Sequence, residues 1–163
     1  MRSDTVKIVL ASRKDAPGIL ALQKLAFQGE AEIHDDYSVS PLTQTLEDLL
    51  EEFKIYRFYK ASKGNDLAGS VRTLVKGNTC HIGRLIVHPQ FQKHGIDSLL
   101  MSCVELRHPK VERFELFAGH RSMRNLILCR KLGYKEFKRE KIHGDLTLVF
   151  LEKRNKGPDC VEQ

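Results

Sequence analysis

Residues 84–106, RLIVHPQFQKHGIDSLLMSCVEL, join an apolar strand to an amphipathic helix through a short polar loop. The helical part carries an apolar stripe with a spacing of three and four residues, at Ile96, Leu99, Leu100, Cys103 and Val104. A second β-type run follows at 113–117. Because a strand that returns to its sheet through a helix runs parallel to the first, this unit predicts an α/β sheet with a parallel pair.

The rest of the chain supplies the other elements of such a sheet. Apolar or alternating runs predict strands at 7–11, 56–62, 67–74, 79–87, 134–141 and 146–151. Helical spacing predicts helices at 15–33, from Ser40 as N-cap and Pro41 as first residue through Phe53, and from Ser122 to a stop at Gly133. The strands between 56 and 87 form a meander, which favours antiparallel pairing and makes the sheet mixed.

The length of 163 residues fits one domain, which we place at 1–154, with a flexible tail at 155–163. A hydrophobic content of 41% beside 29% charged residues is ordinary for a globular protein in water. No run approaches the roughly 18 apolar residues of a membrane span. The N-terminus also has no signal-peptide pattern, so we expect neither a membrane partner nor secretion.

The spacing of cysteines and histidines bears on compartment and metal. The four cysteines form no CxxC pair, which argues against a zinc site or a disulfide framework: Cys80, Cys103, Cys129 and Cys160. The seven histidines show neither HxxxH nor HExxH spacing, so no metal is expected. We therefore expect a reducing, cytoplasmic setting.

The net charge of +6 permits binding to an anion such as nucleic acid, an acidic surface or a phosphorylated cofactor. The basic residues are spread through 107–140 and 152–156, where they alternate with glutamates and lack a concentrated set of aromatic residues. This pattern favours a solvated basic surface over a nucleic-acid patch.

The loop from Gln92 to Gly95 has the composition of an anion site. A helix N-terminus presents backbone N–H groups and the positive end of the helix dipole, and it binds phosphate for both reasons. Gly95 permits close approach of the backbone, and Lys93 adds a cation. An ordinary tight turn is the alternative explanation.

Residues 84–100, RLIVHPQFQKHGIDSLL, resemble motif A of the GNAT family of N-acetyltransferases. That motif is an apolar strand, V-x-P, and then Q/R-x-x-G-x-G/A, which here reads Val87-His88-Pro89 and residues 92–97. Residues 122–137, SMRNLILCRKLGYKEF, are similar to the second cofactor segment of the family. The resemblance implies a GNAT-like fold: a mixed, mostly antiparallel sheet of about six or seven strands, flanked by about four helices, with a splayed parallel pair in its centre.

The resemblance also implies acetyl-CoA as the acyl donor. Its pyrophosphate is expected on the backbone N–H groups of Gln92, Lys93, His94, Gly95, Ile96, Asp97 and Ser98. Its pantetheine arm is expected to pair with the backbone of Leu85, Ile86 and Val87, where the strand of this family bulges and splays from the next strand. Asn125 matches the family asparagine that helps to hold the cofactor, and a solvated polar residue in a first helical turn is the alternative.

Two residues depart from the family pattern. Asp97 replaces the last Gly/Ala of motif A, where a carboxylate suits a helix N-terminus but would repel a pyrophosphate. Cys129 stands where the family often has the tyrosine that protonates the leaving thiolate. A thiol can in principle donate a proton, but packing is the commoner role of a small buried cysteine.

The general base has two candidates. His81 falls where histone-acetylating relatives keep a catalytic glutamate, and an imidazole exchanges protons near neutral pH. A histidine that merely faces solvent is the alternative. Glu115, on the neighbouring predicted strand, is the second candidate.

The predicted activity is direct transfer of an acetyl group to a primary amine of a small molecule or peptide. Residues 29–36, predicted to lie in the loop between the first two helices, could draw a cationic amine through Glu30, Glu32, Asp35 and Asp36, although a solvated loop explains them equally well. The alternative function is a CoA or acyl-CoA sensor without efficient turnover. Dimerisation through the C-terminal sheet edge is possible on this fold.

Overall fold

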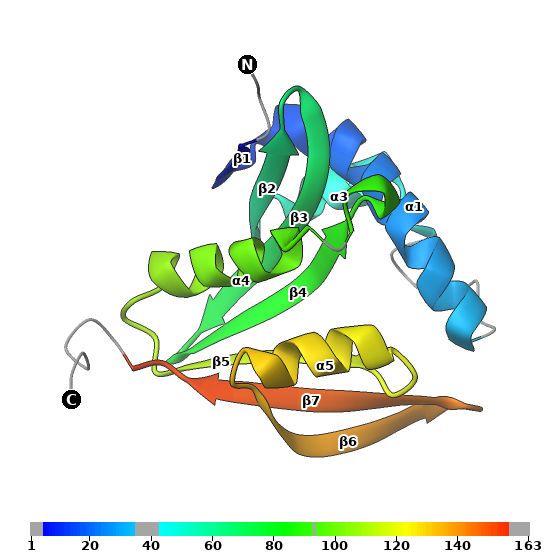
Figure 1. The fold of residues 1–163 in the computed structure, drawn as a ribbon, viewed down its shortest axis with the longest axis vertical. Helices are drawn as coiled ribbons and strands as arrows, with labels where there is room; N and C mark the ends of the chain where they lie inside the picture. The colour runs from blue at the N-terminus through cyan, green and yellow to red at the C-terminus, as the bar shows by residue number, and fades with distance from the viewer. Residues whose placement is uncertain (1–4, 35–42, 93, 157–163) are drawn as a thin grey trace.

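The computed structural model describes residues 5–34, 43–92 and 94–156, and their elements follow the predicted order (Figure 1). The strands are β1 (Val6–Leu10), β2 (Arg57–Lys63), β3 (Asp66–Lys76), β4 (Thr79–Val87), β5 (Arg113–Gly119), β6 (Lys135–His143) and β7 (Leu146–Arg154). The helices are α1 (Ala16–His34), α3 (Leu46–Glu52), α4 (Ile96–Arg107) and α5 (Met123–Lys131). None of the helices in the described ranges is long and apolar enough to cross a membrane.

The start of α3 shows how local chemistry sets a helix boundary. Thr45 is its N-cap, and its side-chain oxygen accepts the backbone N–H of Asp48 at 3.1 Å. Asp48 in turn accepts the backbone N–H of Thr45 at 3.4 Å, which completes a capping box. The predicted helix from Ser40 through Phe53 is wrong at residues 44 and 45, which are not helical, because Thr45 caps a separate helix; the predicted cap at Ser40 and Pro41 lies outside the described residues.

The seven strands form one sheet in the order β1-β2-β3-β4-β5-β7-β6. β4 and β5 are parallel, and every other neighbouring pair is antiparallel. The mixed α/β architecture with a central parallel pair is therefore confirmed. The parallel pair arises because α4 carries the chain from the end of β4 back to the start of β5.

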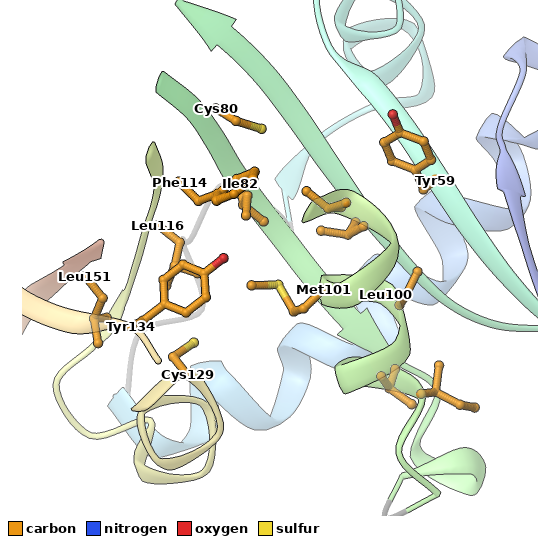
Figure 2. Packing of buried hydrophobic residues seen from close by; sticks show 14 of the residues in the cluster. Tyr59, Cys80, Ile82, Leu100, Met101, Phe114, Leu116, Cys129, Tyr134 and Leu151 are labelled. Atoms are coloured by element: carbon orange, nitrogen blue, oxygen red, sulfur yellow. The ribbon is translucent and has the colours of Figure 1, made fainter. Parts of the chain in front are cut away.

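Helices cover the two faces of the sheet unequally (Figure 1). α1 and α3 pack on one face of the first strands through Ala16, Ile19 and Leu49, which meet Phe58 of β2. α4 and α5 lie on the opposite face and share one apolar cluster there. Figure 2 shows Met101 of α4 and Cys129 of α5 in this cluster, both near Tyr134.

Candidate functional site

β4 and β5 diverge soon after they begin, and this opens the sheet in its middle (Figure 1). Their register covers residues 79–81 of β4 and 113–115 of β5, and its last pair is His81 with Glu115. Beyond that pair β4 continues to Val87 beside β3. The V-shaped gap between the two strands matches the splayed pair that the resemblance implies.

A bulge bends β4 on the far side of this vertex. The register with β3 shifts by one residue between the Ser70–Ile86 pair and the Arg72–Gly83 pair, so the extra residue lies in β4. Arg84 sits at the bulge with φ +50° and is the one non-glycine residue in the described ranges with a positive φ. A bulge of this kind bends its strand and increases the local twist, here directly before residues 85–87.

A cavity of about 260 Å³ lies beside the wide end of the gap. Its walls come from α1, the end of β4, the following loop and the starts of α4 and α5: Ala26, Phe27, Leu85, Ile86, Val87, Gln92, Asp97, Ser122, Met123, Arg124 and Asn125. Six of the predicted cofactor residues thus meet around one cavity. They are Leu85, Ile86, Val87, Gln92, Asp97 and Asn125.

The N-terminus of α4 approaches the cavity through Asp97. Gly95 adopts the left-handed conformation with φ +78° as the N-cap, which explains a glycine at this position. The Asp97 carboxylate accepts the backbone N–H of Ser98 at 2.7 Å, so it occupies one of the donors predicted to hold phosphate. Ile96 turns its side chain into the core, where it is 1% exposed, so only its backbone is available at the loop. His94 is exposed, and Lys93 lies outside the described residues.

Gln92 links the two walls of the cavity. Its side-chain oxygen accepts a hydrogen bond from Arg124 of α5 at 2.6 Å, and its amide nitrogen donates to the Val87 carbonyl at 3.4 Å. Arg124 also brings a cation to the cavity, which Asp97 lines as well. The lining of the cavity therefore carries both a positive and a negative charge.

The two candidate bases meet at the vertex of the V. His81 Nδ1 lies 3.8 Å from Glu115 Oε2, and the two side chains are 39% and 18% exposed. Arg113 contacts the other oxygen of Glu115 at 3.0 Å and also holds Glu152 at 2.8 Å. Glu115 is therefore fixed by an arginine on one side and faces the imidazole on the other.

Cys129, the third predicted catalytic residue, lies in the core. It is 3% exposed, belongs to the apolar cluster under α4 and α5, and is not among the residues that line the cavity (Figure 2). Burial raises the pKa of its thiol to about 11, and the Asp97 carboxylate adds to this rise. These surroundings favour the packing alternative over proton donation.

The two predictions for the acidic segment at 29–36 overlapped, because residues 29–33 were assigned both to the first helix and to the loop after it. The helix prediction is confirmed and the loop prediction is wrong here, since residues 29–34 belong to α1, which ends at His34. Nothing is described of the side chains of Glu30 and Glu32, and Asp35 and Asp36 lie outside the described residues. The acceptor role predicted for these four residues stays a prediction.

The sequence did not point to several residues of the site. Ser122 was predicted only as a helix cap, yet it is 3% exposed and lines the cavity. Arg124 follows it at the start of α5, and its position beside Asn125 was the available signal. Ala26 and Phe27 belong to α1, far away in the sequence, so their place in the wall depends on tertiary packing alone.

Comparisons with known proteins agree with this geometry. The acetyltransferase (GNAT) domain family matches residues 54–136, just over half of the chain. Curated protein sequences give no match. Among solved structures, a ribosomal-protein alanine N-acetyltransferase from Escherichia coli superposes with a TM-score of 0.78 at 12% identity, over 98% of this chain and 99% of that one.

Two further structures share the fold. yncA from Salmonella typhimurium, solved with its cofactor acetyl-CoA, has a TM-score of 0.74 at 14% identity, with 97% of this chain and 98% of that chain covered. A chimera of the spermidine N-acetyltransferase SpeG from Vibrio cholerae and hSSAT has a TM-score of 0.74 at 14% identity, with 93% and 96% covered.

Proposed function

Because the chain belongs to the GNAT acetyltransferase family, we propose that it transfers the acetyl group of acetyl-CoA directly to a primary amine. The observation that carries this proposal is the V-shaped gap between β4 and β5, with a cavity at its wide end and the His81–Glu115 pair at its vertex. A site of this shape accommodates a long donor from one end and brings its reactive end to titratable groups at the other.

The backbone of β4 provides the binding surface for the arm of the donor. Registered pairing with β5 ends at His81, whereas Leu85, Ile86 and Val87 line the cavity. An arm that contains amides can extend the sheet here in the manner of an added strand. At the other end, the backbone N–H groups at the start of α4 and the Arg124 guanidinium would face the pyrophosphate.

His81 is our candidate for the general base. The attacking amine must be neutral, and its nitrogen forms a C–N bond to the acetyl carbon while the C–S bond breaks and the thiolate leaves. The imidazole would accept the amine proton, and Glu115, fixed by Arg113, would orient the ring. Since Cys129 is buried, we assign the proton for the thiolate to solvent.

We place the acceptor on the face of the sheet that carries His81 and Glu115. The Escherichia coli and SpeG structures are named for an alanine of a protein and for spermidine, and both acceptors present an amine. No described helix covers this face beside β5 (Figure 1). This openness supports an amine at the end of a peptide or of a flexible small molecule as the acceptor.

A CoA or acyl-CoA sensor is the second candidate function, and Asp97 favours it. Its carboxylate lines the cavity and accepts the Ser98 N–H that a pyrophosphate would need. Two like charges only a few ångströms apart weaken binding of the donor. A sensor would bind the cofactor without releasing free CoA when an amine is added.

The test begins with calorimetric titration of acetyl-CoA into the native protein and the Asp97→Gly and Asp97→Asn variants. We expect micromolar binding by the native protein and about three- to tenfold tighter binding by Asp97→Asn, since the amide can still accept the Ser98 N–H without the repulsive charge. If none of the three proteins binds, the cofactor assignment is wrong. Binding by the variants alone would mean that Asp97 has disabled an inherited site.

CoA release in the presence of an amine panel then separates enzyme from sensor. The panel contains spermidine, a peptide with an N-terminal alanine and a peptide with an internal lysine. We expect release with at least one of them, and a His81→Gln variant that binds acetyl-CoA like the native protein but releases CoA about 10²-fold more slowly. An equal rate in His81→Gln would remove His81 from the mechanism, and no release with any amine would favour the sensor.

A further inference from the structure

Arg84 is an unusual residue for the middle of a central strand. It lies at the bulge of β4 with φ +50°, a conformation that L-residues with a side chain rarely adopt and that the surrounding structure must enforce. Its side chain is only 11% exposed. A long cation at this position therefore needs an explanation from its contacts.

The guanidinium of Arg84 is held by three side chains from the helical layer behind the sheet. Its Nη1 donates to Gln44 Oε1 at 2.8 Å and to Gln23 Oε1 at 3.4 Å, and it lies 3.4 Å from Glu52 Oε1. Gln23 belongs to α1, Gln44 precedes α3, and Glu52 ends α3. One side chain of β4 thus joins both helices that cover this face.

Two of these partners are buried and hydrogen-bonded to each other. Gln23 is 1% exposed and Gln44 is 6% exposed, and the Gln23 amide donates to Gln44 Oε1 at 2.8 Å. Glu52 also binds Arg72 of β3 at 2.6 Å. A buried polar network of this kind is favourable only when its members keep their geometry, so it fixes the guanidinium firmly.

The network is next to the cavity. Leu85, Ile86 and Val87 follow Arg84 directly and form the β4 wall, while Ala26 and Phe27 lie about one helical turn beyond Gln23 on α1 and form the facing wall. The residues of both walls therefore lie within four positions of a residue that takes part in this hydrogen-bond network.

We propose that Arg84 is a positioning residue: through Gln23, Gln44 and Glu52 it holds the β4 bulge in its left-handed conformation and so sets the backbone of residues 85–87 for the donor. This inference rests on the proposed function. The arginine acts through the backbone and through α1, and it does not touch the reacting atoms.

The decisive variant is Arg84→Gly, with CoA titration and thermal melting as the readouts. Glycine adopts a φ of +50° without strain, so this variant keeps access to the backbone angle while it removes the tether and leaves the backbone freer to move. We expect CoA to bind about tenfold more weakly, the equivalent of roughly one lost hydrogen-bonded tether. Native affinity in Arg84→Gly would overturn the proposal, since the angle alone would then suffice.

Arg72→Ala is the matched control. Arg72 is 16% exposed, binds the same Glu52 oxygen and stacks on Tyr56 at 3.9 Å, but it lies on β3, where it pairs with Gly83, and it does not carry the left-handed backbone angle. We expect it to lower the melting temperature while the CoA dissociation constant stays within about twofold. An equal loss of CoA affinity in Arg72→Ala would reduce Arg84 to a general stabilising residue and overturn the proposal.

Gln44→Ala provides a second approach should Arg84→Gly fail to fold. It removes the 2.8 Å acceptor and leaves β4 unchanged, and we expect about threefold weaker CoA binding. Native affinity in this variant would contradict the proposal. Absence of CoA binding by the native protein would instead contradict the proposed function, so the two failures are distinct.

Discussion

The two halves of the sheet differ in how they are covered. β1 to β4 lie between α1 and α3 on one face and α4 on the other, whereas β5, β7 and β6 have α5 on one face and no described helix on the other (Figure 1). The sequence of each half reflects this. Residues 68–71 of β3 are buried without interruption, while all nine residues of β6 are exposed.

This difference shows that the two faces of the sheet have different roles. The apolar layer between the sheet and helices α4 and α5, here called the shared layer, holds the two halves together, and the opposite face of β5, β7 and β6, here called the open face, is available for binding. The cluster under α4 and α5 runs through both halves, from Tyr59 of β2 to Val149 and Leu151 of β7. On the opposite side of β5, Glu115 and Phe117 point away from this cluster. Substitutions in the shared layer should therefore change stability, and substitutions on the open face should leave it nearly unchanged.

Leu100→Ala should have the largest effect. Leu100 is 0% exposed and packs between α4 and β3, where the end of its side chain would lie 3.1 Å from a Cβ on Gly69. Loss of its side chain leaves a cavity and should lower the free energy of unfolding by about 3 kcal/mol. Urea unfolding measures this, and the exposed Leu106→Ala on the same helix is the control. If both substitutions lower the free energy of unfolding equally, the distinction between the shared layer and the exposed surface of α4 is wrong.

Gly69→Ala should have the next largest effect, because it pushes β3 away from β4. A Cβ on Gly69 would lie 2.8 Å from the Ile86 carbonyl, a backbone atom that cannot move aside cheaply. We expect a loss of about 2 kcal/mol, measured by urea unfolding. At Gly83 on β4, a Cβ would meet the flexible Arg72 side chain at 3.4 Å, so Gly83→Ala is the matched control. A neutral Gly69→Ala would show that the covered half is less tightly packed than its burial indicates.

The sequence predicted the local elements of both halves, and it also predicted which short segments contribute to the cofactor site. The apolar stripe of α4 and the strand at 79–87 are local patterns, and the structure confirms both the elements and their place in a mixed sheet. The motif resemblance assigned Leu85, Gln92 and Asp97 to one cofactor site, and these three residues line the same cavity. Such features were predictable because each depends on periodicity or on a short segment.

Features that arise from contacts between distant segments were not predictable. The cavity wall at Phe27 and the tether from Gln23 to Arg84 join α1 to β4 across about sixty residues, and no local pattern encodes them. The left-handed angle at Arg84 is contrary to the preference of its residue type. For residues 29–33 the sequence supported two conflicting predictions, the end of the first helix and an acidic loop, and the structure places these residues in α1, which ends at His34.

The dependence of stability on alkaline pH tests whether the shared layer excludes water equally well in both halves of the sheet. Burial raises the pKa of Cys80 in β4 to about 12 and that of Cys129 in α5 to about 11, from a usual value near 9.0. The unfolded chain then releases these protons at a lower pH than the folded chain, so stability is complete below pH 9 and falls as pH rises.

Cys129→Ala should remove the part of this loss of stability at high pH that comes from the Cys129 thiol. Between pH 8 and 10 the native protein should lose about 1.4 kcal/mol more stability than the variant, the amount for one thiol and one pH unit above its unfolded pKa. Urea unfolding at both pH values measures this, and subtracting the pH 8 values cancels the packing cost of the substitution. If both proteins lose the same amount of stability between pH 8 and 10, water reaches Cys129. The shared layer under α5 would then exclude water less well than the part under α4.

Phe117→Ala should have the smallest effect on stability and is the most direct probe of the open face. Phe117 is 57% exposed, and its ring lies 5.3 Å from that of Phe150 between ring centroids, so its loss should cost only about 0.5 kcal/mol. Its neighbour on the opposite face, Leu116, is 8% exposed and serves as the contrast through Leu116→Ala. A loss of about 2 kcal/mol or more in Phe117→Ala would mean that the open face is covered in solution, for example by a second copy of the chain.

With stability intact, a changed KM for the amine and an unchanged affinity for acetyl-CoA would place the acceptor on this face, because Phe117 lies two residues beyond Glu115 on the same side of β5.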